Sequence, residues 1–98
     1  MNSLELEVNK QAKRKATQFL ETNSDFAGSY EQVFLVYKFV DTPLKQIKQG
    51  LDLKSRECAK KYYRMIVKNI HPDKNHHPLA KEAFQKIQLA YAPCYSQP

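Results

Sequence analysis

The apolar positions near the start of the chain recur every three or four residues, which is the spacing of one face of an α-helix. The residues on this face are Leu4, Val8, Ala12, Ala16 and Phe19. Charged and polar side chains fill most of the remaining positions, and Ser3 is a residue type that often caps a helix. We therefore predict an amphipathic helix from about Leu4 to Glu21.

The next apolar segment, Val33–Val40, has no clean helical or strand period. Its β-branched and aromatic residues favour a strand, but its neighbours are patterned as helices, and Ser29 and Gln32 have the spacing of a capping box. We expect a helix here and keep a strand as the alternative. Turn-forming residues precede the segment, so the two helices would form an antiparallel hairpin joined near residues 22–29.

Two more helices are expected in the middle of the chain. Thr42 and Pro43 suit the cap and first position of a short helix, which Gly50 would end. Its apolar stripe is Leu44, Ile47 and Leu51. Ser55 suits the cap of a longer helix with an apolar side and a basic side. The apolar side holds Ala59, Tyr62, Tyr63, Ile66 and Ile70, and the basic side holds Lys61, Arg64 and Lys68.

A proline corner, His71-Pro72-Asp73-Lys74-Asn75, follows this longer helix. Pro72 has a fixed φ and disfavours the α region for the residue before it, so the helix should end near Ile70. Asp73 suits an Asx-turn, which would give a stiff, exposed corner carrying an imidazole and a carboxylate. A last helix should begin at Pro78 and end at Pro93. Its buried face would be Ala80, Phe84, Ile87 and Tyr91.

Three parts of the chain together resemble a J-domain, the module of DnaJ-type co-chaperones. They are the helix before the corner, the corner itself and the spacing Ala80-x-x-x-Phe84-x-x-Ile87-x-x-Ala90-Tyr91. The resemblance covers roughly residues 43–91. It implies a protein that docks on a DnaK-type heat-shock ATPase, speeds its ATP hydrolysis and so helps to trap a client. It also implies that His71, Pro72 and Asp73 are the essential signal, with Asp73 pairing with a basic residue of the ATPase. The other docking residues implied by the resemblance are Lys61, Tyr63, Arg64, Lys68 and Lys74.

Three positions depart from the family pattern. Met65 and Gln85 stand where a basic residue is common, and Tyr62 stands where a small residue is usual. A weaker affinity for the ATPase is the expected consequence.

These patterns predict an all-α fold in two parts. Residues 1–41 would form the N-terminal helical hairpin, and residues 42–98 would form a J-domain-like unit whose two main helices pack antiparallel with the His-Pro-Asp loop between them. The expected core of this unit is Ala59, Tyr63, Ile66, Ile70, Phe84, Ile87 and Tyr91. The hairpin would either recruit a specific client or a second subunit, or complete a small core.

Charge divides the chain unevenly. Residues 1–42 hold five Lys/Arg and six Asp/Glu, a net −1, whereas residues 43–98 hold eleven and four, a net +7. A positive half suits an acidic protein surface or nucleic acid, so a small basic nucleic-acid-binding protein is the alternative function. The basic run Lys10–Lys15 could be a nuclear address or a nucleic-acid contact, although such a run is usually the solvated side of a helix. Neither a long apolar segment nor a secretory signal is seen, so we expect a cytoplasmic or nuclear protein without a membrane partner.

Two other kinds of site would also fit parts of the sequence, a zinc site and a catalytic site. His71 and His76 have metal-ligand spacing, and Cys58 and Cys94 could complete a zinc site. However, Cys58 lies near the start of the helix that ends before His71, which separates the two by roughly 20 Å. We expect no metal and no cofactor. The sequence has no nucleophile with an orienting base and no glycine-rich phosphate loop, so we do not expect an enzyme.

Overall fold

The computed structural model describes the backbone of residues 3–95 and the side chains of residues 6–91. Within this part the chain forms five α-helices and no strand, as the all-α prediction requires. The helices are α1 Ser3–Thr22, α2 Tyr30–Asp41, α3 Leu44–Asp52, α4 Arg56–Ile70 and α5 Ala80–Tyr95. The predicted cap at Ser3 and the predicted place of Leu4 on the buried face lie outside the described side chains.

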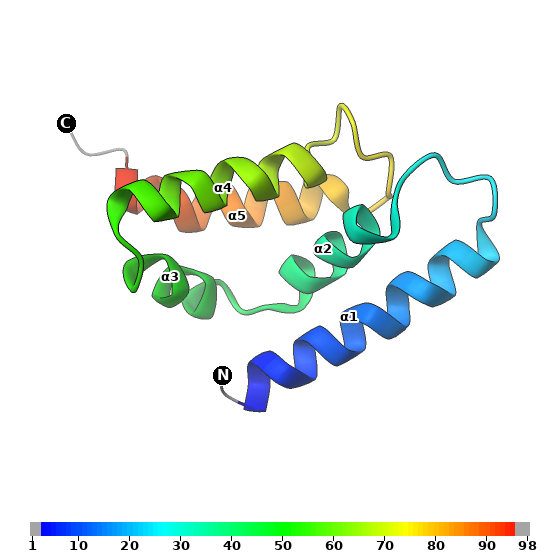
Figure 1. The fold of residues 1–98 in the computed structure, drawn as a ribbon, viewed down its shortest axis with the longest axis horizontal. Helices are drawn as coiled ribbons and strands as arrows, with labels where there is room; N and C mark the ends of the chain where they lie inside the picture. Colours follow the sequence, from blue (N-terminus) through cyan, green and yellow to red (C-terminus); the bar gives the residue numbers. More distant parts are fainter. Residues whose placement is uncertain (1–2, 96–98) are drawn as a thin grey trace.

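Helices α1 and α2 form the expected antiparallel hairpin, with α1 on the outer side of the molecule (Figure 1). On α1, Val8, Ala12 and Ala16 are buried, and the small alanines let α2 approach closely. The capping box at the start of α2 is present: the Ser29 hydroxyl accepts from the Gln32 amide at 3.2 Å, and the Gln32 side chain accepts from the Ser29 amide at 3.0 Å. The prediction of a helix is therefore confirmed for the whole segment Val33–Val40, whose residue types favour a strand.

The apolar content of α2 is explained by its position. This helix packs against α1 on one side and against α4 and α5 on the other, so it buries more than one face. Its buried residues are Val33, Leu35, Val36 and Phe39. A helix that is apolar over most of its circumference is stable only when it is surrounded in this way.

A single cluster of buried side chains joins α2 to the three helices that follow. Its members are Leu35, Val36, Phe39, Ile47, Leu51, Ala59, Ile66, Ile70, Ala80, Ala83, Ile87 and Ala90. Of the core residues expected from the sequence, Tyr63, Phe84 and Tyr91 lie at the edge of this cluster and are only partly buried. The alanines of α5 take the central positions because α3, α2 and α4 all pack closely on that helix.

The short helix α3 starts and ends later than predicted. Thr42 caps the end of α2 instead, because its hydroxyl and its amide both donate to the Lys38 carbonyl, at 2.6 and 3.0 Å. Pro43 therefore takes the N-cap position of α3. Gly50 lies inside the helix, which continues to Asp52 while Leu51 packs in the core. The first correction reflects a local hydrogen-bonded cap, and the second shows the packing of Leu51 overriding a local stop signal.

The limits of α5 also differ from the prediction. Pro78 lies in a turn, closed by the Ala80 amide donating to the His77 carbonyl at 3.0 Å, and the helix begins at Ala80. At the other end, α5 extends to Tyr95, two residues past Pro93. A proline in the last turn of a helix removes one backbone hydrogen bond, and this loss does not end the helix here.

Candidate partner-docking site

Helix α4 carries the candidate site and ends at the proline corner. Ser55 caps its first turn by accepting from the Cys58 amide at 3.2 Å, and Glu57 lies near the positive end of the helix dipole. At the far end, His71 takes an extended conformation, with φ −59° and ψ 129°, as expected for the residue before a proline. The helix therefore leads directly into the His-Pro-Asp loop.

The corner is closed by His71 and not by the predicted Asx-turn of Asp73. The His71 carbonyl accepts from the amides of Lys74 and Asn75, at 2.9 and 2.8 Å. The His71 ring accepts from the Asp73 amide through Nδ1 at 3.1 Å. Because Nδ1 accepts in this geometry, the proton of the neutral imidazole is on Nε2. The Asp73 side chain is 87% exposed, so its carboxylate is open to an outside group.

The imidazole of His71 is less exposed than the sequence suggests. Its side chain is 37% exposed, and its ring centroid lies 4.7 Å from that of Phe84 on α5. A ring packed against another element has a fixed orientation, whereas a side chain at a free corner has several rotamers. Helix α5 thus orients the imidazole that α4 and the corner present.

A groove of about 400 Å³ lies beside the corner. It is lined by Tyr63, Arg64, Val67, Lys68, His71, Asp73 and Lys74. Of the eight docking residues implied by the sequence, Lys61 and Pro72 do not line it: Lys61 is exposed on α4, and Pro72 is half-buried at the corner. Val67 was missed by the sequence analysis, although it lies four residues from both Tyr63 and His71 and so on their face of the helix.

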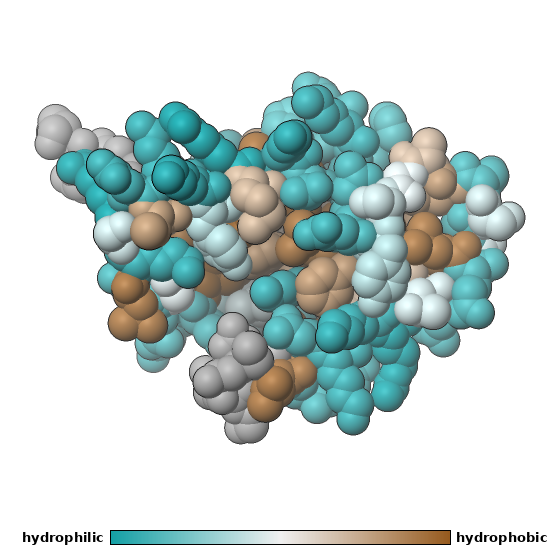
Figure 2. All heavy atoms as spheres, in the orientation of Figure 1, coloured by the Kyte–Doolittle hydropathy of each residue, from teal (hydrophilic) through white to brown (hydrophobic). Residues whose placement is uncertain are grey.

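The groove combines an apolar floor with a charged rim. Tyr63 stacks on Tyr91 of α5 with ring centroids 3.8 Å apart and an interplanar angle of 16°, which holds the floor in place. Arg64, Lys68 and Lys74 are exposed, and Figure 2 shows hydrophilic side chains along the edge that α4 and the loop form. The rim is therefore positive, with the exposed carboxylate of Asp73 as a negative group among its basic side chains.

Comparison with known proteins agrees with this geometry. The DnaJ domain family matches residues 47–93. Residues 47–93 are a J-domain. Such domains are the defining module of DnaJ-type co-chaperones, which as a family are generally not enzymes themselves. No solved structure matches the chain significantly.

Three relatives illustrate the similarity. An uncharacterised J domain-containing protein of Schizosaccharomyces pombe is 40% identical over 65 residues, which are 62% of this chain and 16% of the relative. DnaJ homolog subfamily B member 14 of Xenopus laevis is 58% identical over 36 residues, 37% of this chain and 10% of the relative. DnaJ homolog subfamily C member 14 of Homo sapiens is 53% identical over 32 residues, 33% of this chain and 5% of the relative. The chain thus spans less than a fifth of the length of each of these relatives.

The second half of the J-domain loop contains two buried polar residues, Asn75 and His77, which the sequence analysis did not foresee. Asn75 is 2% exposed. Its Nδ2 donates to the carbonyls of Asn69 on α4 and Gln32 on α2, at 2.9 and 3.2 Å, and its Oδ1 accepts from the His77 amide at 3.0 Å. The loop is therefore tied to the last turn of α4 and to a helix outside the matched residues.

His77 is the second buried polar residue of the loop, at 5% exposure. Its Nδ1 accepts from the Leu79 amide at 3.0 Å, so its Nε2 carries the proton and meets the Tyr37 hydroxyl at 3.0 Å. The ring lies 4.3 Å from that of Phe19 and 6.3 Å from that of Phe26. Burial lowers the pKa of His77. Burial also raises the pKa of Tyr37, and the positive charge of Lys15 opposes this rise. A neutral imidazole thus fits this apolar site.

Proposed function

We propose that this chain is a co-chaperone that docks on a DnaK-type heat-shock ATPase and accelerates its ATP hydrolysis. The observation that carries the proposal is the groove beside the His-Pro-Asp loop, with its apolar floor, basic rim and exposed Asp73 carboxylate. A partner surface with acidic groups around a basic residue would complement it. In this proposal the protein holds no nucleotide, and its effect is a coupling between the docked groove and the partner's active site.

The roles of the individual residues follow from their positions. Asp73 would pair with a basic residue of the ATPase, and Lys61, Arg64, Lys68 and Lys74 would meet its acidic surface. Tyr63 and Val67 would provide apolar contact on the groove floor. His71 and Pro72 would hold the corner in shape, since the His71 carbonyl and ring close the turn.

A single-turnover ATPase assay with a DnaK-type chaperone tests the proposal. The intact protein is expected to accelerate hydrolysis, and His71→Gln is expected to abolish the acceleration while changing the melting temperature little, because the ring is partly exposed. Absence of acceleration by the intact protein, combined with tight binding to RNA or DNA at physiological salt, would refute the proposal and favour a nucleic-acid-binding function.

Recruitment of a client by residues 1–41 is the finer proposal. Most apolar residues of α2 are buried in the molecule, so the surface available for a client is small. Among the described side chains of the hairpin, the large apolar ones that are exposed are Leu6, at 55%, and Tyr30, at 45%. An array of unfolded peptides tests the idea: Leu6→Ser with Tyr30→Ser should lose peptide binding and keep ATPase acceleration. Equal peptide binding by this double variant would contradict a client site on the hairpin.

A further inference from the structure

The loop between α4 and α5 has two halves with different surroundings. Residues 71–74 form the corner, in which Asp73 and Lys74 are exposed. Residues 75–79 include Asn75 and His77, which are buried and contact the hairpin. The two halves share one hydrogen-bonded turn, because the Asn75 amide donates to the His71 carbonyl at 2.8 Å. Whatever fixes Asn75 therefore also fixes the corner.

The buried residues of the second half of the loop, Asn75 and His77, are held by residues of α1 and α2. Gln32 of α2 receives a hydrogen bond from the Asn75 side chain at 3.2 Å, and the Tyr37 hydroxyl of α2 lies 3.0 Å from the His77 ring. Phe19 of α1 packs on that ring, with centroids 4.3 Å apart. These contacts join residues that are 40 or more positions apart in the sequence. They all come from helices outside the residues that match the J-domain family.

From these contacts we infer that the N-terminal hairpin is the positioning element of the His-Pro-Asp loop, with Asn75 and His77 as its anchors. Neither anchor lines the docking groove. They act through His71 and Asp73, whose placement relative to α4 they hold. The inference rests on the proposed ATPase stimulation and adds what controls its efficiency.

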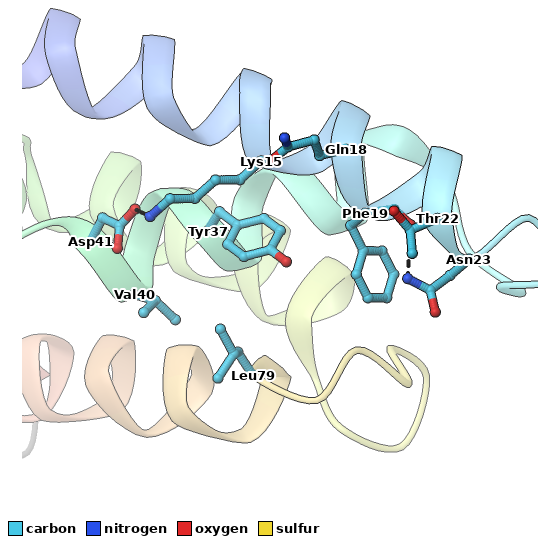
Figure 3. Close-up of a pocket in the computed structure, with 9 residues that line it drawn as sticks. All are labelled: Lys15, Gln18, Phe19, Thr22, Asn23, Tyr37, Val40, Asp41 and Leu79. Carbon is cyan, nitrogen blue, oxygen red and sulfur yellow. Dashed lines mark hydrogen bonds and ion pairs between the residues drawn. The ribbon is translucent and has the colours of Figure 1, made fainter.

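The contacts around His77 make Phe19 the appropriate residue to change. Phe19 is half-buried and also packs against Phe26, with ring centroids 5.0 Å apart in an edge-to-face arrangement. Together with Tyr37 and Leu79, it lines an open groove of about 480 Å³ between the end of α1 and the start of α5 (Figure 3). Truncating its ring would free one face of the His77 imidazole without touching the docking groove.

The experiment compares the full chain with Phe19→Ala and with Val8→Ala as a matched control. Val8 is a buried apolar residue of the same helix, at 8% exposure, and lines a different groove near α3. ATPase acceleration is measured as a function of co-chaperone concentration, at a temperature where circular dichroism shows both variants folded. Amide hydrogen exchange of Asn75 and His77 is measured on the same samples.

Phe19→Ala is expected to raise exchange at Asn75 and His77 and to lower the maximal acceleration several-fold. The half-saturating concentration should stay the same, because the basic rim is intact. Val8→Ala should keep both kinetic parameters, and Phe19→Tyr, which retains the ring, should restore the maximum. Equal maximal accelerations for Phe19→Ala and Val8→Ala would overturn the inference.

Two further variants keep the outcome decisive. If Phe19→Ala does not fold, Tyr37→Phe is used in its place, because this change keeps the ring and removes only the hydroxyl that meets His77. An unchanged maximal ATPase acceleration for Tyr37→Phe would then overturn the inference. His71→Gln separates the two proposals. If His71→Gln still accelerates hydrolysis, the proposed function fails. If it abolishes acceleration while the hairpin variants behave as the intact chain does, only the positioning role fails.

Discussion

Replacing Asn75 by alanine should cost more stability than any other single change in the loop. Three hydrogen bonds end on its side chain, at 2.9, 3.2 and 3.0 Å, and their partners are two backbone carbonyls and one backbone amide. A net hydrogen bond contributes about 1 kcal/mol, and a buried backbone group left unpaired costs about 1–3 kcal/mol. Gln32 and Asn69 are half-buried, so water can replace part of what is lost.

We therefore expect Asn75→Ala to lower the free energy of unfolding by about 2–3 kcal/mol. For a chain of this length, that corresponds to a fall in melting temperature of roughly 10–20 °C. Equilibrium urea denaturation, followed by far-UV circular dichroism, measures the difference. Asn75→Asp should also destabilise the protein, because a carboxylate would face the two carbonyls even though it still accepts from the His77 amide.

Asn69→Ala is the matched control for this measurement. The Asn69 side chain bonds the carbonyl of Met65 one turn back in the same helix, at 2.8 Å, and alanine has a higher helix propensity than asparagine. Its substitution should change stability by less than about 0.5 kcal/mol. If Asn75→Ala and Asn69→Ala were equal, or if Asn75→Ala cost under about 1 kcal/mol, the three hydrogen bonds would not hold the loop as described.

Three further predictions concern charge, pH and truncation. Reversing Lys61, Arg64 and Lys68 to glutamate should slow association with the ATPase, most strongly at low salt, whereas the same reversal at Lys10, Lys13 and Arg14 on α1 should not. Stopped-flow measurements at two ionic strengths compare the association rates of the two variants. Equal rates would show that the α4 face is only solvated and does not contact the ATPase. The pKa of His77 is held below its ordinary value of 6.5, so the unfolded chain binds the proton more readily and stability should fall as the pH drops from that value towards the folded pKa. Urea titrations should show this fall reduced in His77→Gln and kept in His76→Gln, and a fall that is the same in both variants would exclude His77 as its cause. A chain of residues 42–98 should not fold, because it lacks the core residues Leu35, Val36 and Phe39. Losing each of them costs about 2–5 kcal/mol, against a total stability of about 5–15 kcal/mol. A cooperative thermal transition for this fragment would show instead that the hairpin is a separate module.

Features set by neighbouring residues could be predicted from the sequence. The end of α4 follows from Pro72, and the starts of α2 and α4 follow from Ser29 and Ser55, because each depends on contacts within a few positions. The groove beside the corner is similarly local, since its lining residues come from the last turns of α4 and the corner. The helical state of α2 was less certain from pattern alone, because a helix buried on several sides has no amphipathic period.

Features set by distant residues could not be predicted. Asn75 and His77 look like ordinary loop residues, and only the fold brings Gln32, Tyr37 and Phe19 to them across 40 or more positions of sequence. The end of α3 was misplaced for the same reason, since packing of Leu51 outweighs the local preference of Gly50 to stop a helix. In each case the deciding interaction joins helices that no short sequence window contains together.

The end of α4 at the corner has a consequence for how a partner would be aligned. The partial negative charge of a helix dipole gathers at its carboxyl end, within the last turn. The exposed Asp73 carboxylate lies close to that end, and Arg64, Lys68 and Lys74 line the same groove. The surface thus carries negative charge next to basic side chains. In the proposed docking, a partner shifted along α4 by one helical turn, about 5.4 Å, would set like charges against each other, so this arrangement would favour a single register.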